Sequence, residues 1–206
     1  SDKTLSIINR FFLNADYDYQ IFNIPKTNSA AKSYKFALNL ASSKNLLHNY
    51  IALCDQDDIW KTNKLSCFVK ALKSDPLFSS FLFFSDVELI DQSSNLINNS
   101  RYDSSFFFSH PYSSINQAIF LGNPVCGMSM IFSKDIGILY SSYPENDLFM
   151  HDWTIMIIAY FFNSNFSYCK YPLVSYRQHD QNVLGSSSKL NLFCKILRIP
   201  YFINKA

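Results

Sequence analysis

The chain has 206 residues, which suffice for one domain with a sizeable hydrophobic core. Apolar residues make up 48% of the sequence and charged residues 17%, a balance that excludes low-hydrophobicity disorder. The formal net charge is only +2 and no dense basic stripe precedes the C-terminal tail, so nucleic acid is not an expected partner.

Helical and strand patterns alternate along the sequence. Apolar residues spaced by three and four predict helices, and short apolar runs predict strands. In chain order we expect a helix at 4–12, a strand at 19–24, a helix at 30–42, a strand at 50–54, a helix at 64–72, a strand at 81–89, a helix at 114–121, a strand at 128–132, a helix at 152–162 and a strand at 167–176. The polar segment 91–105 predicts a loop. This order indicates an α/β fold with a mostly parallel sheet flanked by helices, whose ligand sites lie at the carboxyl ends of strands.

Three carboxylates, Asp55, Asp57 and Asp58, stand where the strand at 50–54 ends. Carboxylates this close together create a negative pocket that a divalent cation would stabilise. Mg²⁺ and Mn²⁺ typically join one or two protein carboxylates to substrate phosphates, so the pattern predicts a metal site for a phosphate-bearing substrate. The alternative is an acidic turn that favours the start of the following helix.

Five sequence blocks in a fixed order carry a family resemblance. They are the apolar strand with its Asp-x-Asp segment and the blocks downstream of it, at 50–65, 84–91, 122–130, 151–153 and 176–185. Together they resemble family 2 glycosyltransferases with the GT-A fold, especially the rhamnosyltransferase-like members of bacterial polysaccharide pathways. The resemblance implies a Rossmann-like GT-A domain over 1–185, followed by a basic, apolar tail at 186–206.

The resemblance also implies an activity. Such enzymes move a sugar, such as rhamnose, from a UDP- or dTDP-sugar donor to a glycan or lipid-linked glycan acceptor in cell-surface polysaccharide synthesis. The reaction is metal-dependent and inverts the configuration at the anomeric carbon. A phosphatase or nucleotidyltransferase that uses the same acids is disfavoured, because the chain has only four glycines and no glycine loop that would cradle phosphates.

On the donor side, the resemblance implies that Asp55 approaches the nucleotide ribose. Asp57 is expected to bind Mg²⁺ or Mn²⁺, which bridges the two phosphates of the donor, and Asp58 is expected to support it. The donor-binding residues further include Arg177 and Gln178. His179 is expected to contact the metal, although a lone histidine is more often an ordinary surface residue.

On the acceptor side, Asp152 occupies the position of the general base of the family, which takes the proton of the acceptor hydroxyl. The alternative is that Asp152 only caps the helix that begins there. Asp86, Gly127 and Trp153 are expected to contact the acceptor. A plain turn glycine explains Gly127 equally well, and Trp153 is alternatively a core anchor.

The N-terminus departs from the family pattern. Family members open with a strand, a nucleotide-binding loop, a helix and a second strand that ends in an Asp-Asp-Gly-Ser type turn, whereas residues 1–4 resemble only the tail of that turn. We therefore expect an N-terminally truncated GT-A domain with exposed sheet surface and impaired donor binding. The alternative function is a catalytically inactive remnant of such an enzyme.

Other features bear on cellular location. The five cysteines are scattered and form no CxxC pair, which favours reduced thiols and a cytoplasmic protein. No apolar stretch approaches the roughly 18 residues that span a bilayer, and no signal peptide is evident. The tail interleaves apolar and basic residues, so it either lies on the inner face of the plasma membrane or forms a helix packed on the domain.

Overall fold

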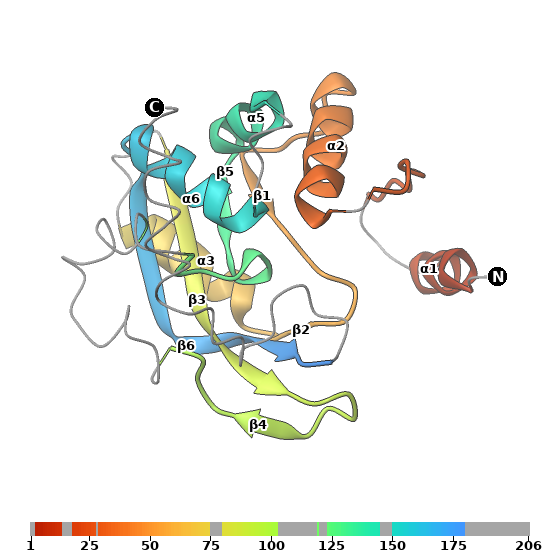
Figure 1. The fold of residues 1–206 in the computed structure, drawn as a ribbon, viewed down its shortest axis with the longest axis vertical. Helices are drawn as coiled ribbons and strands as arrows, with labels where there is room; N and C mark the ends of the chain where they lie inside the picture. The colour runs from red at the N-terminus through yellow and green to blue at the C-terminus, as the bar shows by residue number, and fades with distance from the viewer. Residues whose placement is uncertain are drawn as a thin grey trace.

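The computed structural model describes residues 3–13, 18–27, 29–74, 80–102, 119, 123–144 and 150–179. Within them a six-stranded mixed sheet runs through the centre of the molecule (Figure 1). The strands are β1 (Tyr50–Ala52), β2 (Ile59–Trp60), β3 (Phe81–Ile90), β4 (Leu96–Asn98), β5 (Ile131–Ser133) and β6 (Asn165–Arg177). The helices are α1 (Thr4–Phe12), α2 (Ala30–Ser43), α3 (Lys64–Ser74), α5 (Lys134–Ser142) and α6 (His151–Phe161), with a 3-10 turn η2 (Gly127–Ser129).

The strand order is β1-β5-β3-β6-β2, with β4 paired to β3. Only the long β3–β6 pair is parallel among the described strands, and the other pairs are antiparallel. The prediction of a mostly parallel sheet is therefore wrong. A parallel neighbour needs a crossover of about a dozen residues or more. The link at 91–95 is too short for one, and it closes β3 and β4 into a hairpin where a loop was expected.

Both faces of the sheet are covered, which explains the apolar run that opens β3. Leu82 and Phe84 pack against α2, α5 and α6 on one face, whereas Phe81 and Phe83 pack against α3 on the other. All four side chains are at most 1% exposed. Burying each of them contributes roughly 1.5–3 kcal/mol relative to exposure, so β3 fixes the centre of the core.

Most helices begin and end close to the predicted residues, and the strands at 50–54, 81–89 and 167–176 are present with shifted ends. The segment 19–24 forms no strand, and its apolar side chains are exposed because no neighbouring strand pairs with it. The strand expected at 128–132 is divided between η2 and β5. Helix α5 was not predicted, although Ile136 and Tyr140 stand four residues apart on its buried face.

Helix α1 forms as predicted but lies apart from the sheet (Figure 1). None of its residues is buried, and Leu5, Ile7 and Phe11 are exposed.

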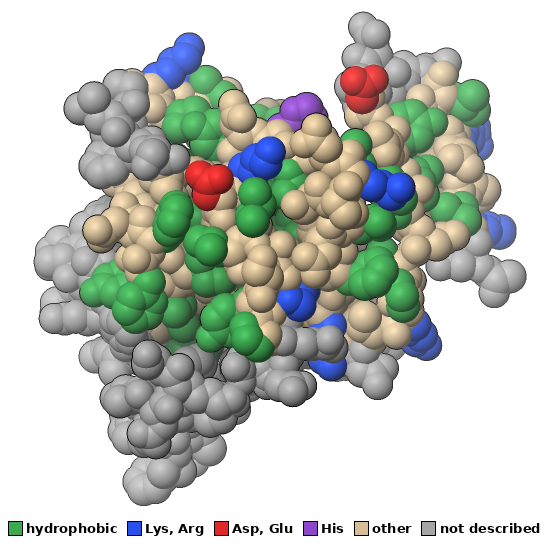
Figure 2. All heavy atoms as spheres, turned by 90° about the horizontal axis from the view of Figure 1, so that it is seen from above, with side chains coloured by type: hydrophobic (Ala, Val, Ile, Leu, Met, Phe, Trp, Pro, Cys, Tyr) green, Lys and Arg blue, Asp and Glu red, His purple; other side chains and the backbone are tan. Residues whose placement is uncertain are grey.

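Among the described helices, none is both long and apolar enough to cross a membrane. The helix expected at 114–121, apart from Ile119, and the tail at 186–206 lie outside the described residues. Seen from above, the basic side chains lie singly among apolar and polar ones (Figure 2).

Candidate active site around the acidic segment

The acidic segment, residues 55–58, links β1 to β2. Strand β2 pairs with the last part of β6, with Ile59 opposite Ser175 and Trp60 opposite Val174. This pairing places the acidic segment beside Arg177, the last residue of β6, and beside the two residues that follow it. Two blocks far apart in the sequence thus meet at the carboxyl end of a strand, where the α/β pattern predicts a ligand site.

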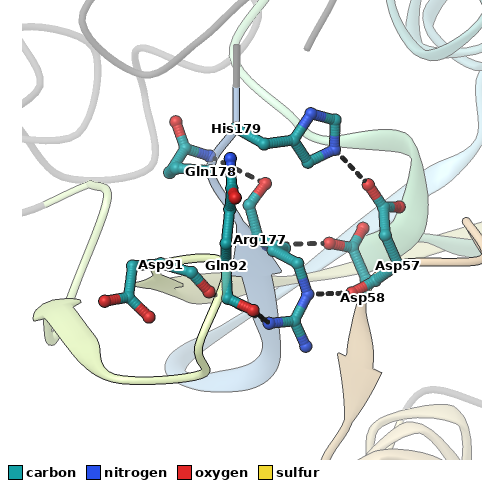
Figure 3. A network of polar contacts seen from close by, with 7 residues as sticks. All are labelled: Asp57, Asp58, Asp91, Gln92, Arg177, Gln178 and His179. Carbon is teal, nitrogen blue, oxygen red and sulfur yellow. Dashed lines mark hydrogen bonds and ion pairs between the residues drawn. The ribbon is translucent and has the colours of Figure 1, made fainter. Parts of the chain in front are cut away.

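Asp57 and His179 form the closest contact between the two blocks. The Nε2 atom of His179 lies 2.6 Å from Oδ2 of Asp57, and the side chains are 24% and 26% exposed (Figure 3). Gln178 precedes the histidine, and its backbone N–H donates to the carbonyl of Ile90 at 2.8 Å. The structure therefore brings together the two residues that the sequence predicts as metal ligands.

Arg177 fastens the acidic segment to the β3–β4 turn (Figure 3). Its backbone N–H donates to Oδ1 of Asp58 at 2.9 Å, and its Nε donates to the carbonyl of Asp57 at 2.8 Å. Its Nη1 donates to the carbonyls of Asp91 and Gln92 at 3.0 and 3.1 Å. These contacts hold the shape of the segment, and donor binding by Arg177 stays a prediction.

Burial makes ionisation of the Asp58 carboxyl group unfavourable. Its pKa is raised to about 6, chiefly by burial; the hydrogen bond from the Arg177 backbone N–H opposes this rise, and the charges of Asp57 and Asp55 add to it. Its Oδ2 atom is buried and has no hydrogen-bond partner among the described residues. A buried carboxylate oxygen without a partner is costly, so this atom is suited to contact a cation or a ligand proton.

Two further buried polar atoms without a partner in the described residues lie close by. They are Nε1 of Trp60, which follows the segment, and Nε2 of His151. The His151 ring packs on the ring of Tyr34 with centroids 4.5 Å apart, and the Tyr34 hydroxyl donates to Oδ1 of Asp55 at 2.6 Å. Unsatisfied buried groups are rare in native proteins. Their concentration around the acidic segment favours a site that a ligand or an ion completes.

The residues present fit an open metal site better than a closed one. Among the described residues, no three His, Cys, Asp or Glu side chains are arranged to hold a metal ion by themselves. The groups available are the Asp57 carboxylate, the His179 ring and the second oxygen of Asp58. Mg²⁺ usually keeps one or two protein carboxylates and completes its shell with phosphate and water. The donor set is compatible with that arrangement.

Asp152 lies in the first turn of α6 and is 6% exposed. Its Oδ1 accepts from the backbone N–H of Trp153 at 2.9 Å, and Met150, at the N-cap position, makes no side-chain cap. The positive end of the helix dipole stabilises a carboxylate there. The Trp153 ring is 7% exposed and its Nε1 donates to the Ile119 carbonyl at 2.6 Å, which favours the core-anchor alternative for this residue.

Gly127 allows η2 to approach α6. A Cβ atom at this position would lie 2.2 Å from Nε2 of His151, so a larger residue would displace the ring beside Asp152. Asp86 is 2% exposed, and it accepts from the Val87 N–H at 2.7 Å and from the Ser100 hydroxyl. Its described contacts are internal, so contact between Asp86 and an acceptor also stays a prediction.

Three residues near the site were given no functional role from the sequence. Tyr34 belongs to an apolar helical stripe, and Arg101 stands in a segment expected to be a loop. Lys64 resembles an ordinary surface lysine, yet it is fully buried, and its Nζ donates to the Met128 carbonyl at 2.5 Å. The same Nζ lies 3.6 Å from the centroid of the Trp60 ring, and burial lowers its pKa to about 7. Lys64 thereby connects the acidic segment to η2.

An α/β protein with clustered carboxylates at strand ends is suited to bind phosphate-bearing substrates through a metal. The sequence is 23% identical over 215 residues to the dTDP-rhamnosyl transferase RfbG of Shigella flexneri, and the alignment covers 100% of this chain and 68% of that protein. No protein-family model matches the chain. The similarity suggests a relationship to glycosyltransferases.

Proposed function

We propose that the chain is an inverting, metal-dependent glycosyltransferase of family 2 with the GT-A fold. It transfers a sugar from a nucleotide-diphosphate donor to a glycan or lipid-linked glycan acceptor. The observation that carries the proposal is the contact of 2.6 Å between Asp57 and His179, beside the unpartnered buried oxygen of Asp58. The similarity to a dTDP-rhamnosyl transferase supports the sugar-transfer class and makes dTDP-rhamnose the first donor to test.

The donor side is formed by the acidic segment and the end of β6. Asp57 and His179 would hold Mg²⁺ or Mn²⁺, with Asp58 in support. When bound, the cation neutralises the charge of the leaving nucleoside diphosphate. Asp55, oriented by the Tyr34 hydroxyl, binds the ribose. Arg177 keeps the segment in place, so that its carboxylates are preorganised before the donor arrives.

On the acceptor side, Asp152 acts as the general base. Its carboxylate removes the proton of an acceptor hydroxyl as that oxygen attacks the anomeric carbon, and the bonding electrons of the anomeric carbon–oxygen bond leave with the diphosphate. Attack from the face opposite the leaving group inverts the anomeric configuration. Gly127 lets η2 approach the start of α6, Trp153 anchors that helix, and Asp86 organises the neighbouring backbone.

Binding of a nucleoside diphosphate tests the donor side directly. Calorimetric titration of the full chain with dTDP should give tighter binding with Mg²⁺ or Mn²⁺ than with EDTA. Asp57→Ala should weaken the metal-dependent affinity by about tenfold or more, because it removes a ligand. Asp135→Ala is the matched control, since Asp135 is exposed on α5. Binding of dTDP that is indifferent to metal, or equal in Asp57→Ala and wild type, would contradict the proposal.

A further inference from the structure

Arg101 follows β4 at a position that the fold holds in place. Its backbone N–H donates to the Val87 carbonyl at 2.9 Å. The Ser100 hydroxyl donates to the buried Asp86 carboxylate, and the N–H groups of Arg101 and Tyr102 act to lower the pKa of Asp86 against the effect of burial. Ser100 and Tyr102 are buried on either side of Arg101. The buried carboxylate thus organises the turn from which Arg101 projects.

The half-buried Arg101 side chain has a weak partner. Its Nη1 donates to Sγ of Cys126 at 2.9 Å, and its Cζ lies 5.6 Å from the centroid of the Tyr102 ring. Burial raises the pKa of Cys126 to about 11, so the acceptor is a neutral thiol. A guanidinium carries five N–H donors and stays charged, whereas a thiol is a weak acceptor. No carboxylate in the described part of the chain forms an ion pair with Arg101.

The Arg101 side chain lies near the proposed base and the acidic segment. Arg101 contacts Cys126, and Cys126 directly precedes Gly127, where a Cβ atom would lie 2.2 Å from Nε2 of His151, the neighbour of Asp152. The charges of Asp152 and Asp58 also contribute to raising the pKa of Cys126. Arg101 and its thiol partner therefore lie close to the start of α6, which carries the proposed base, and the buried cluster that contains Cys126 packs against Trp60, which follows the acidic segment.

We propose that Arg101 is a binding residue for a phosphoryl group of the substrate. The planar guanidinium matches the spacing of phosphate oxygens and binds them through paired hydrogen bonds. Asp86 is engaged in internal hydrogen bonds, and among the described residues neither Asp86 nor Asp152 forms an ion pair with the guanidinium. The proposal rests on the proposed function only for the source of the phosphoryl group, which is either the diphosphate of the donor or the phosphate of a lipid-linked acceptor.

Inorganic phosphate in EDTA is the first probe, because it excludes binding through a metal. We expect saturable binding by the wild-type chain, measured by calorimetry, and a loss of about tenfold or more in Arg101→Gln. Arg101→Lys should lose about threefold or more, because lysine keeps the charge without the fork. Arg10→Gln on the exposed α1 is the matched control and should bind within about twofold of wild type.

The proposal fails if the wild-type chain shows no saturable phosphate binding. It also fails if Arg101→Gln, or Arg101→Lys where the first variant does not fold, binds phosphate as tightly as Arg10→Gln. Circular dichroism of each variant establishes that it is folded before titration.

Titration with dTDP and Mg²⁺ then separates the two sources. Weaker dTDP binding by Arg101→Gln, together with lost phosphate binding, assigns the phosphoryl group to the donor. Unchanged dTDP binding assigns it to the acceptor. If the wild-type chain binds phosphate in EDTA but shows no metal-stimulated dTDP binding, the anion site stands and the glycosyltransferase proposal fails, so the two failures are distinguishable.

Discussion

Replacing Lys64 with methionine should remove a pH-dependent contribution to stability. The lysine is fully buried under the acidic segment, and burial lowers its pKa from 10.5 to about 7. Between these two values the unfolded chain binds more protons than the folded chain, so the free energy of unfolding rises with pH in this window. The contribution is complete above the unfolded pKa, decreases as the pH falls below that value, and is absent below about pH 7.

The size of the effect follows from the shift. One pKa unit corresponds to about 1.4 kcal/mol, so the whole window is worth at most about 5 kcal/mol. Between pH 7 and 9 the stability of the wild-type chain should increase relative to Lys64→Met by about 2–3 kcal/mol. The replacement also removes the hydrogen bond to Met128 and the contact with Trp60, which adds an offset that does not follow this pH dependence.

Urea unfolding of the wild-type chain and of Lys64→Met at pH 6, 7.5 and 9 measures the difference between their free energies of unfolding. Effects of pH that are common to both chains cancel in this difference. Lys70→Met is the matched control, since Lys70 is exposed on the same helix. Its difference from wild type should stay constant within about 0.5 kcal/mol across the pH series. A Lys64→Met difference that is equally constant would refute the inference that a charged lysine is destabilised at this site.

Two further predictions concern the scaffold of the site. Gly127→Ala should displace the His151 ring, because the new Cβ would lie 2.2 Å from Nε2 of the histidine. We expect the variant to be destabilised by about 1–3 kcal/mol and to transfer sugar more slowly. Thermal unfolding and turnover equal to wild type would contradict this prediction. Arg177→Lys should cost about 1–3 kcal/mol in urea unfolding, because lysine does not reproduce the hydrogen bonds of Nε and Nη1 to the carbonyls of Asp57, Asp91 and Gln92. A stability equal to wild type would show that these bonds are not needed to hold the segment.

The sequence predicts those parts of the fold that depend on local periodicity. Helices α2, α3 and α6 have apolar stripes at helical spacing, and β3 is an apolar run covered on both faces. Strand direction is a different matter, because it depends on which distant segments pair. The link at 91–95 is short enough to close a hairpin, yet β4 has only three residues and lies within a polar segment rich in Ser and Asn, so it gave no strand signal.

The same distinction applies to the site. Asp57 and His179 were predictable from residue type and family resemblance, and the structure places them in contact. Arg101 was not predictable in this way, because its proposed role depends on a contact with Cys126, which is distant in the sequence. Lys64 was missed for a related reason. A lysine at the start of an amphipathic helix is normally solvated, and only the packing of η2 and Trp60 around it makes it buried.

Sugar transfer by Asp152→Asn tests the central claim most directly. Radiolabelled dTDP-rhamnose would be incubated with the folded chain, Mg²⁺ and membranes that carry lipid-linked glycans, and the label in the glycan would be counted. The account predicts transfer by the wild-type chain and a loss of about 100-fold or more in Asp152→Asn, with dTDP affinity retained and with Asp135→Asn as control. Transfer by Asp152→Asn at the wild-type rate would contradict the assignment of the base, and a folded wild-type chain that binds dTDP without transferring sugar from any nucleotide-sugar donor would identify an inactive remnant instead.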